Sequence, residues 1–192
     1  VYSYAHVPWM KANQRKTEEA LLPSPEDKLR LFAEARRAFT AAGYDPIGMD
    51  HFALPDDELA VAAREGKLHR NFMGYTTRPA PDMIGLGVSS IGDVCGAYFQ
   101  NHKILPKYKN AVAAGELPVL RGVELTPSDL VRRDVIHDIM CNWHVDKRKV
   151  EERWGIHFDE EFAAEIDDLV AEVDHGFVEM DADAIRVVGT GR

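Results

Sequence analysis

The sequence predicts an α/β protein in which strand–helix units are followed by a mostly helical region that ends in a hairpin. In the first half, strand-like and helix-like segments alternate, an order typical of parallel βα units. In the second half, three helix-like segments with one apolar face precede two short apolar segments around a turn. The two regions are expected to meet near Pro118, which divides the chain into residues 1–117 and 118–192.

The first strand is predicted over residues 2–7. After a polar stretch, Ser24 is placed to cap a helix and Pro25 suits the first helical position. Apolar residues then recur at helical spacing until Gly43, which ends the run. Residues 44–52 follow as a buried strand that ends in polar groups.

A second helix is predicted from Asp56 to Gly66, and a third apolar strand over residues 83–88. Three βα units are too few for a complete barrel, so this half is expected to form the closing arc of one.

The second half begins with Thr126, which repeats the capping pattern at the start of a long helix. A short helix is expected over residues 147–154 and a third from about Glu160 to Gly176. Residues 177–188 then form two strand-like segments around a turn. Three helices followed by a hairpin give the outline of a winged helix.

Composition excludes several classes of protein. The net charge of −9 argues against a nucleic-acid backbone as partner, because such binding needs a concentrated basic surface. No apolar run approaches the roughly 20 residues that span a bilayer. Cys95 and Cys141 lie far apart without metal-ligand spacing, so we expect no disulfide framework, no bound metal and a reducing, cytoplasmic setting.

Three segments are candidates for chemistry. At the predicted end of a strand, Asp50 and His51 would lie at the mouth of a barrel, where a histidine can transfer protons and an aspartate can orient it. A capping aspartate beside a half-buried, hydrogen-bonded histidine is the alternative. The polar and aromatic segment 69–77 suits a ligand-binding loop whose Arg70 can pair with a carboxylate, or an irregular connection whose rings fill the core. The glycines in 85–93 are better explained by close packing than by a dinucleotide site.

Several of these segments resemble one known family. The chain carries Tyr-Ala-His at 4–6, Leu-Pro-Ser-Pro at 22–25, Gly-Met-Asp-His-Phe-Ala at 48–53, Asn-Phe-Met-Gly-Tyr-Thr-Thr at 71–77 and Arg-Arg-Asp-Val-Ile at 132–136. In this order the motifs resemble the oxygen-independent coproporphyrinogen III oxidases of the radical S-adenosylmethionine superfamily. The resemblance covers essentially the whole chain and identifies it as a C-terminal part of such an enzyme.

The resemblance implies a reaction in haem biosynthesis and its cofactors. Two propionates of coproporphyrinogen III are oxidatively decarboxylated to vinyl groups, which gives protoporphyrinogen IX. A [4Fe–4S] cluster generates a 5′-deoxyadenosyl radical from S-adenosylmethionine, and two molecules of S-adenosylmethionine bind. The implied fold is an incomplete βα barrel with a mostly helical C-terminal domain, and the whole enzyme is expected to be a monomer.

The resemblance also assigns residues. Ala5 matches a position that contacts the first S-adenosylmethionine, and Phe72 and Ile91 match positions that line a second site. Met73 lies beside Phe72, where some members carry Gln, and a thioether barely accepts a hydrogen bond. We expect Asp50, His51 and Arg70 on the substrate side, from position alone.

The cluster-binding cysteines of the family lie in a segment that precedes Val1, so we expect this polypeptide alone to be inactive. An exposed strand edge would favour self-association. Two alternatives stay open: a haem-handling relative without decarboxylase activity, which the segment 71–77 disfavours, and a winged-helix binding module, which the acidic helix after Glu160 disfavours for DNA.

Overall fold

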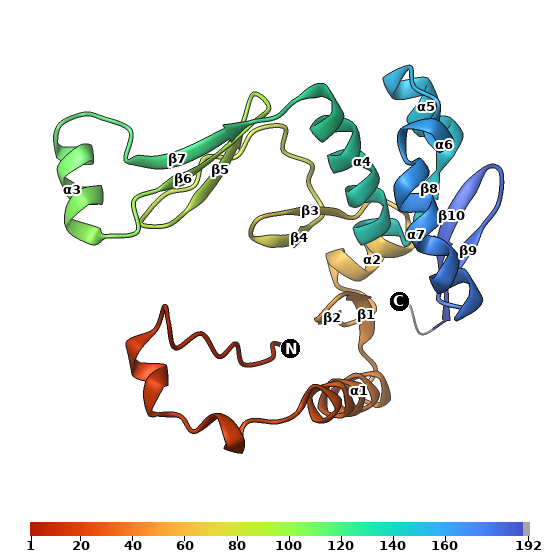
Figure 1. Ribbon diagram of the computed structural model, residues 1–192, viewed down its shortest axis with the longest axis horizontal. Helices are drawn as coiled ribbons and strands as arrows, with labels where there is room; N and C mark the ends of the chain where they lie inside the picture. The colour runs from red at the N-terminus through yellow and green to blue at the C-terminus, as the bar shows by residue number, and fades with distance from the viewer. Residues whose placement is uncertain (190–192) are drawn as a thin grey trace. The chain divides into compact units, whose positions relative to one another are not determined.

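The computed structural model describes residues 1–189, in two compact units that divide between Glu65 and Gly66. Each unit combines helices with small sheets (Figure 1), as the predicted α/β class requires. All strand pairs among the described residues are antiparallel, so the parallel pairing predicted for the first half is not found there. The predicted boundary near Pro118 lies inside the second unit, just before a strand.

The first unit opens without the strand predicted over residues 2–7, and that prediction was wrong. The amide of Val7 donates to Gln14 Oε1 at 2.6 Å, and Gln14 Nε2 donates to the carbonyl of Ala5 at 3.0 Å. A single side chain therefore takes backbone groups that a neighbouring strand would otherwise bind. Two short 3-10 helices follow, Ala12–Lys16 and Glu19–Leu21.

Helix α1, Pro25–Ala41, begins as its capping pattern predicts. Ser24 Oγ accepts a hydrogen bond from the amide of Asp27, and the Asp27 carboxylate accepts one from the amide of Ser24. Gly43, with φ of +88°, follows the end of the helix, where the left-handed region suits glycine. Both ends of this helix were therefore predicted correctly.

The strand predicted over residues 44–52 is a hairpin of two short strands, β1 (Asp45–Gly48) and β2 (His51–Ala53). The chain reverses at Met49, which has a φ of +48°. The single-strand prediction was wrong because the run of apolar residues does not reveal this left-handed turn. Helix α2, Glu58–Arg64, follows and begins at an Asp57 cap.

The core of the first unit lies between this hairpin and the two helices. The ring of Phe39 on α1 stacks on Phe52 with centroids 4.9 Å apart. The buried hydrophobic residues of this unit are Ile47, Ala53, Ala60 and Ala62.

The second unit begins with a hairpin and a three-stranded sheet, neither of which the sequence analysis predicted. The hairpin consists of β3 (His69–Asn71) and β4 (Gly74–Thr76). The sheet has the order β5-β6-β7, and its strands are β5 (Ile91–Val94), β6 (Ala97–Asn101) and β7 (Val119–Glu124). Helix α3 (Leu105–Ala113) connects β6 to β7 and lies at one end of the sheet (Figure 1). Cys95 and Gly96 form the two-residue turn between β5 and β6, with φ of +51° and +77°, as a type I′ turn requires.

The strand predicted over residues 83–88 is reduced to one bridge between Met83 and Asp93. The carbonyls of Gly85 and Gly87 accept hydrogen bonds from Nδ2 of the buried Asn101, at 2.9 and 3.0 Å. These carbonyls are therefore bound by a side chain and not by a strand, which is why the prediction failed.

The C-terminal region contains the expected helices and hairpin. Thr126 caps α4 through a reciprocal pair of hydrogen bonds with Asp129, as predicted. The helix expected from Glu160 to Gly176 is two helices with a break at Phe162. The elements are α4 (Pro127–Asn142), β8 (His144–Asp146), α5 (Lys147–Trp154), α6 (Phe158–Glu161), α7 (Ala163–Asp174), β9 (Val178–Met180) and β10 (Ala184–Val187).

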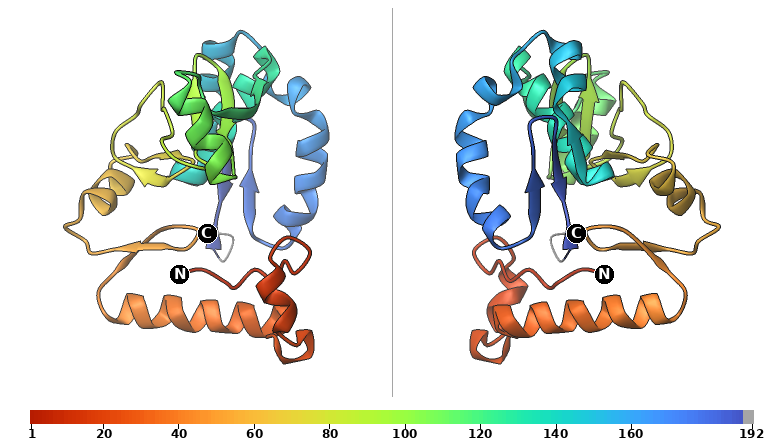
Figure 2. Two further views of the ribbon diagram at one scale, coloured as in Figure 1. Left: turned by 90° about the vertical axis from the view of Figure 1, so that its left-hand side faces the viewer. Right: turned by 90° about the vertical axis from the view of Figure 1, so that its right-hand side faces the viewer.

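The strands β8, β10 and β9 form a sheet in that order, and α7 runs alongside it (Figure 2). The helices and this sheet enclose one apolar core, whose buried members are Val131, Val135, Val145, Val150, Phe158, Phe162, Val178 and Ile185. None of the helices within residues 1–189 combines the length and apolar character that a bilayer crossing requires.

Candidate ligand-binding face

One side of the β5-β6-β7 sheet gathers side chains from all three strands in two adjacent rows. Residues directly opposite each other in an antiparallel sheet share a face, and so do residues two apart along a strand. The register therefore places six side chains on one face, which we call the Tyr98 face: Ile91, Gln100 and Arg121 in one row, and Asp93, Tyr98 and Val123 in the next.

The β3–β4 hairpin adds an aromatic ring to the Tyr98 face. Its two-residue turn consists of Phe72 and Met73, and Asn71 Oδ1 accepts a hydrogen bond from the amide of Met73 at 2.8 Å. The ring of Phe72 meets that of Tyr98 edge to face, with centroids 5.0 Å apart and an interplanar angle of 90°. Phe72 is still 52% exposed, so much of its ring is available for contact with a ligand.

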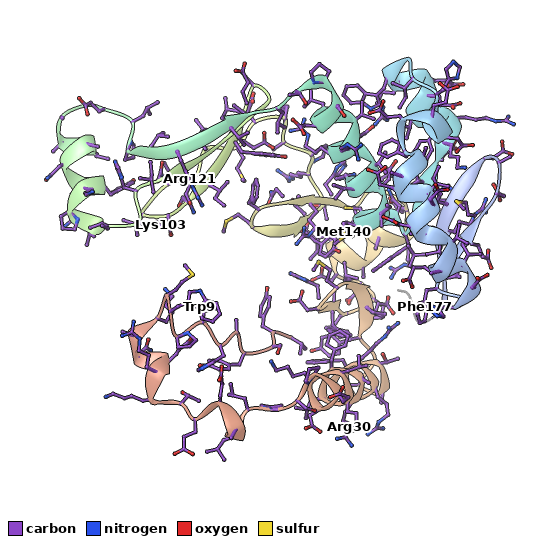
Figure 3. The ribbon with its side chains drawn as sticks, viewed as in Figure 1. Trp9, Arg30, Lys103, Arg121, Met140 and Phe177 are labelled. Carbon is purple, nitrogen blue, oxygen red and sulfur yellow. The ribbon has the colours of Figure 1, made fainter. Side chains whose placement is uncertain are left out.

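Helix α4 holds this hairpin in place. The hydroxyl of Tyr75 donates to the carbonyl of Met140 at 2.9 Å, and Figure 3 labels Met140 on α4. The rings of His69 and His137 lie 5.1 Å apart between β3 and α4. Burial, and secondly the proximity of His137, lower the pKa of His69 below its usual range, which favours the neutral ring.

Arg70 is directly opposite Tyr75 in the hairpin, and its guanidinium lies over the Tyr75 ring at 5.7 Å. The Arg70 side chain is exposed, and the ring contact restricts where its guanidinium lies. Met73 is 87% exposed at the tip of the hairpin. The structure thus brings Phe72 and Ile91 to one face and leaves Met73 beside it.

Charged groups border the Tyr98 face. Arg121, labelled on β7 in Figure 3, donates from Nη2 and Nε to Gln100 Oε1, at 2.9 and 3.2 Å. Gln100 is itself fixed by a hydrogen bond from Nε2 to the carbonyl of Ser89 at 3.1 Å. Asp93 lies 3.4 Å from Arg133, and burial raises the pKa of its carboxyl, although Arg133 opposes that shift.

Three of the residues predicted from the sequence lie in the first unit. Asp50 is in the turn between β1 and β2, and His51 begins β2, so neither ends a strand as predicted. The two side chains are in contact, with Asp50 Oδ1 2.7 Å from His51 Nδ1. Ala5 is exposed, and its carbonyl is bound by Gln14.

The two cysteines lie in different surroundings. Cys95 is exposed in the β5–β6 turn, whereas Cys141 is buried on α4, with its Sγ 3.7 Å from His137 Nε2. Burial raises the pKa of the Cys141 thiol to about 11, which disfavours the thiolate that binds metals. Residues 1–189 contain no group of three or more His, Cys, Asp or Glu side chains placed to hold a metal ion. The described residues therefore do not fit an iron–sulfur cluster, which needs several thiolates.

Sequence reasoning missed Tyr98, Gln100 and Arg121, because the strands that carry them were not predicted. One signal was available: Gly96 lies between two segments that contain strand-forming residues, and a glycine in that position marks a turn.

Comparison with known proteins gives one consistent result. No protein-family model matches the chain. Over all 192 residues it is 46% identical to the oxygen-independent coproporphyrinogen III oxidase of Salmonella typhimurium and 45% identical to that of Escherichia coli. It is 42% identical to that of Synechocystis over 197 aligned positions. In each case the chain spans 42% of the relative's length.

A solved structure of coproporphyrinogen III oxidase from Escherichia coli, described as a radical S-adenosylmethionine enzyme, matches 98% of the chain with a TM-score of 0.93 at 45% identity. The match covers 44% of that structure. The predicted resemblance is therefore confirmed: the chain is homologous over its whole length to part of these enzymes.

Proposed function

We propose that this chain is part of an oxygen-independent coproporphyrinogen III oxidase and contributes ligand-binding residues to its active site. The proposed reaction converts two propionates of coproporphyrinogen III to vinyl groups. Each propionate loses a hydrogen atom to the 5′-deoxyadenosyl radical, one electron to an external electron acceptor, and carbon dioxide. When bound, the [4Fe–4S] cluster and S-adenosylmethionine supply the radical that removes the hydrogen atom. The homology over the full length of the chain supports this assignment.

We also propose the finer architecture that the family implies. Residues 1–117 would supply the closing units of a βα barrel that is not fully closed. Residues 118–192 would form the helical C-terminal domain with its winged-helix-like hairpin. The match to 98% of the chain at a TM-score of 0.93 supports this proposal.

The observation that carries the proposed function is the position of Phe72 and Ile91. These two residues are 19 positions apart in the sequence, yet the hairpin contact with Tyr98 and the register of β5 and β6 bring them to one face. An exposed aromatic ring beside an aliphatic side chain suits the adenine of S-adenosylmethionine, because a nucleobase has a flat face that stacks on aromatic side chains. Met73 would add apolar contact at the edge of this site but no strong hydrogen bond.

The remaining predicted residues have roles that suit the substrate or the first cofactor. Asp50 and His51 are in contact, and the imidazole of His51 is a group that can accept or donate a proton. Arg70 presents a guanidinium that can bind a propionate. The exposed Ala5 would contact the first S-adenosylmethionine through a segment that Gln14 holds in place.

The experiment uses the full-length protein that contains this chain, with its cluster reconstituted under anaerobic conditions. Coproporphyrinogen III, S-adenosylmethionine, a reductant and an electron acceptor are supplied, and porphyrin products are separated by chromatography after oxidation. Formation of protoporphyrin supports the proposal, and its absence from a preparation that cleaves S-adenosylmethionine supports a haem-handling relative instead.

The Phe72→Ala variant tests the site within that experiment. Loss of one base-stacking ring should raise the KM for S-adenosylmethionine by on the order of tenfold, since such stacking contributes about 1–3 kcal/mol. Phe177→Ala is the matched control, because Phe177 is also a partly exposed phenylalanine of the second unit but lies between α7 and β9 (Figure 3). Equal KM values for the two variants would argue against a cofactor site at Phe72.

A further inference from the structure

Arg121 is positioned on the Tyr98 face by a neutral partner. Its Nε and Nη2 groups both donate to Gln100 Oε1, and Gln100 is anchored by the carbonyl of Ser89. A guanidinium has five N–H donors in a rigid plane. The contact with Gln100 fixes the orientation of that plane and engages only two of the donors.

The positive charge of Arg121 is not balanced by an acidic side chain of the described residues: no carboxylate within residues 1–189 forms an ion pair with it. Most arginines of the second unit are paired, as the ion pairs Arg132–Glu165, Arg133–Asp93, Arg148–Asp183, Arg153–Asp134 and Arg186–Asp181 show. In a chain with a net charge of −9, acidic partners are abundant. An oriented arginine that has none is suited to bind an anion from outside the chain.

The spacing between Arg121 and Ile91 on the Tyr98 face sets how far the anionic group of a ligand would lie from its apolar part. Arg121 and Ile91 lie in the same row on β7 and β5, with β6 between them. Neighbouring strands are about 4.8 Å apart, so the two backbone positions are separated by roughly 10 Å. This is about the extent of a small ligand with an apolar ring at one end and a carboxylate at the other.

We propose that Arg121 binds a carboxylate of the molecule that lies on the Tyr98 face, and that Gln100 is a positioning residue for its guanidinium. This inference rests on the proposed function. Two sources can supply the carboxylate: a propionate of the tetrapyrrole substrate, or the methionine moiety of S-adenosylmethionine. In both, two parallel N–H···O bonds from the guanidinium edge fit the carboxylate geometry.

The test compares pairs of probes that differ only in the carboxylate, with the reconstituted full-length protein. Coproporphyrin III is compared with its tetramethyl ester by fluorescence titration, and S-adenosylmethionine with decarboxylated S-adenosylmethionine by calorimetry. The variants are Arg121→Gln, which removes the charge, and Arg121→Lys, which keeps the charge but cannot donate two parallel hydrogen bonds to a carboxylate. Gln100→Glu should pair with Arg121 and compete with the ligand. Arg148→Gln is the control, since Arg148 is an exposed, ion-paired arginine on α5.

We expect Arg121→Gln to weaken binding of one acidic probe by about 10- to 100-fold, the usual range for hydrogen bonds to a charged group, and to leave its carboxylate-free counterpart unchanged. Arg121→Lys should retain part of the affinity, and Gln100→Glu should lose affinity with an unchanged melting temperature. Loss for coproporphyrin III identifies a propionate, and loss for S-adenosylmethionine identifies the methionine carboxylate.

If all variants bind both acidic probes within twofold of Arg148→Gln, the Arg121 assignment is overturned and the proposed function stands. A wild-type protein that binds neither coproporphyrin III nor S-adenosylmethionine overturns the proposed function, and this inference with it.

Discussion

Replacing Gly85 with alanine tests how the Tyr98 face is held together. A Cβ at this position would lie 2.6 Å from the carbonyl oxygen of Ile91 and 2.8 Å from the Cβ of Ser90, closer than real Cβ contacts allow. Gly85 does not have a positive φ, so alanine introduces no conformational strain there. The carbonyl of Gly85 is held by Asn101, so the displacement should fall on the backbone of Ile91.

The expected cost is that of overpacking, about 1–3 kcal/mol. A domain of 150–250 residues loses about 2–4 °C of melting temperature per kcal/mol, and a longer protein loses less, so Gly85→Ala should lower the melting temperature of the full-length protein by less than about 12 °C. Because Ile91 moves, the affinity for S-adenosylmethionine should fall as well. Thermal unfolding by circular dichroism and calorimetric titration of the full-length protein measure the two effects.

Gly115→Ala provides the comparison. Gly115 has a φ of +75° and open space around its Cβ position, so alanine there costs about 1–2 kcal/mol through backbone strain alone. Both variants should be less stable, but only Gly85→Ala should bind S-adenosylmethionine more weakly. An unchanged melting temperature for Gly85→Ala, or equal affinity losses in the two variants, would show that Gly85 does not hold Ile91 in place.

Three further predictions concern the hairpin and helix α4. Tyr75→Phe removes a hydrogen bond to a carbonyl of α4 and should cost about 0.5–1.5 kcal/mol, with faster hydrogen exchange of the hairpin amides; unchanged exchange would contradict the proposed anchor. Burial and the proximity of His137 lower the pKa of His69 in the folded protein. As the pH falls below about 6.5, His69 is therefore protonated in the unfolded chain before it is protonated in the folded one. Stability is therefore retained above that pH and lost below it, and His69→Gln should flatten this dependence in urea titrations at several pH values; the same slope in both proteins would exclude His69 as its source. Iodoacetamide at pH 8 should label the exposed Cys95 and spare the buried Cys141, whose thiol has a pKa of about 11, until the protein is denatured. Comparable labelling of both cysteines, measured by mass spectrometry, would be inconsistent with the structure.

Local signals in the sequence predicted the helices well. The caps at Ser24 and Thr126 involve residues three positions apart, so their hydrogen bonds are visible in the sequence itself. The strands were harder to predict. An extended segment becomes a strand only when a partner lies beside it, and for residues 2–7 the side chain of Gln14 takes that place. Within residues 44–52, the left-handed turn at Met49 converts one expected strand into two.

The site residues were hard to predict from the sequence for the same reason, because strand pairing between distant segments brings them together. Phe72 and Ile91 were identified by resemblance to a family, and nothing in their spacing indicates that they share a face. Their proximity follows from the register of β5 and β6 and from the ring contact with Tyr98, which join segments distant in sequence. Arg121 depends on a further pairing, with Gln100 across β6 and β7. Periodicity within one segment does not specify such pairings.

The most direct test of the account is a crystal structure of the full-length protein with S-adenosylmethionine and coproporphyrin III bound. We expect a bound molecule against the ring of Phe72 and the side chain of Ile91, with a carboxylate at Arg121. A structure in which other parts of the protein cover Phe72, and in which both ligands bind away from the Tyr98 face, would contradict it.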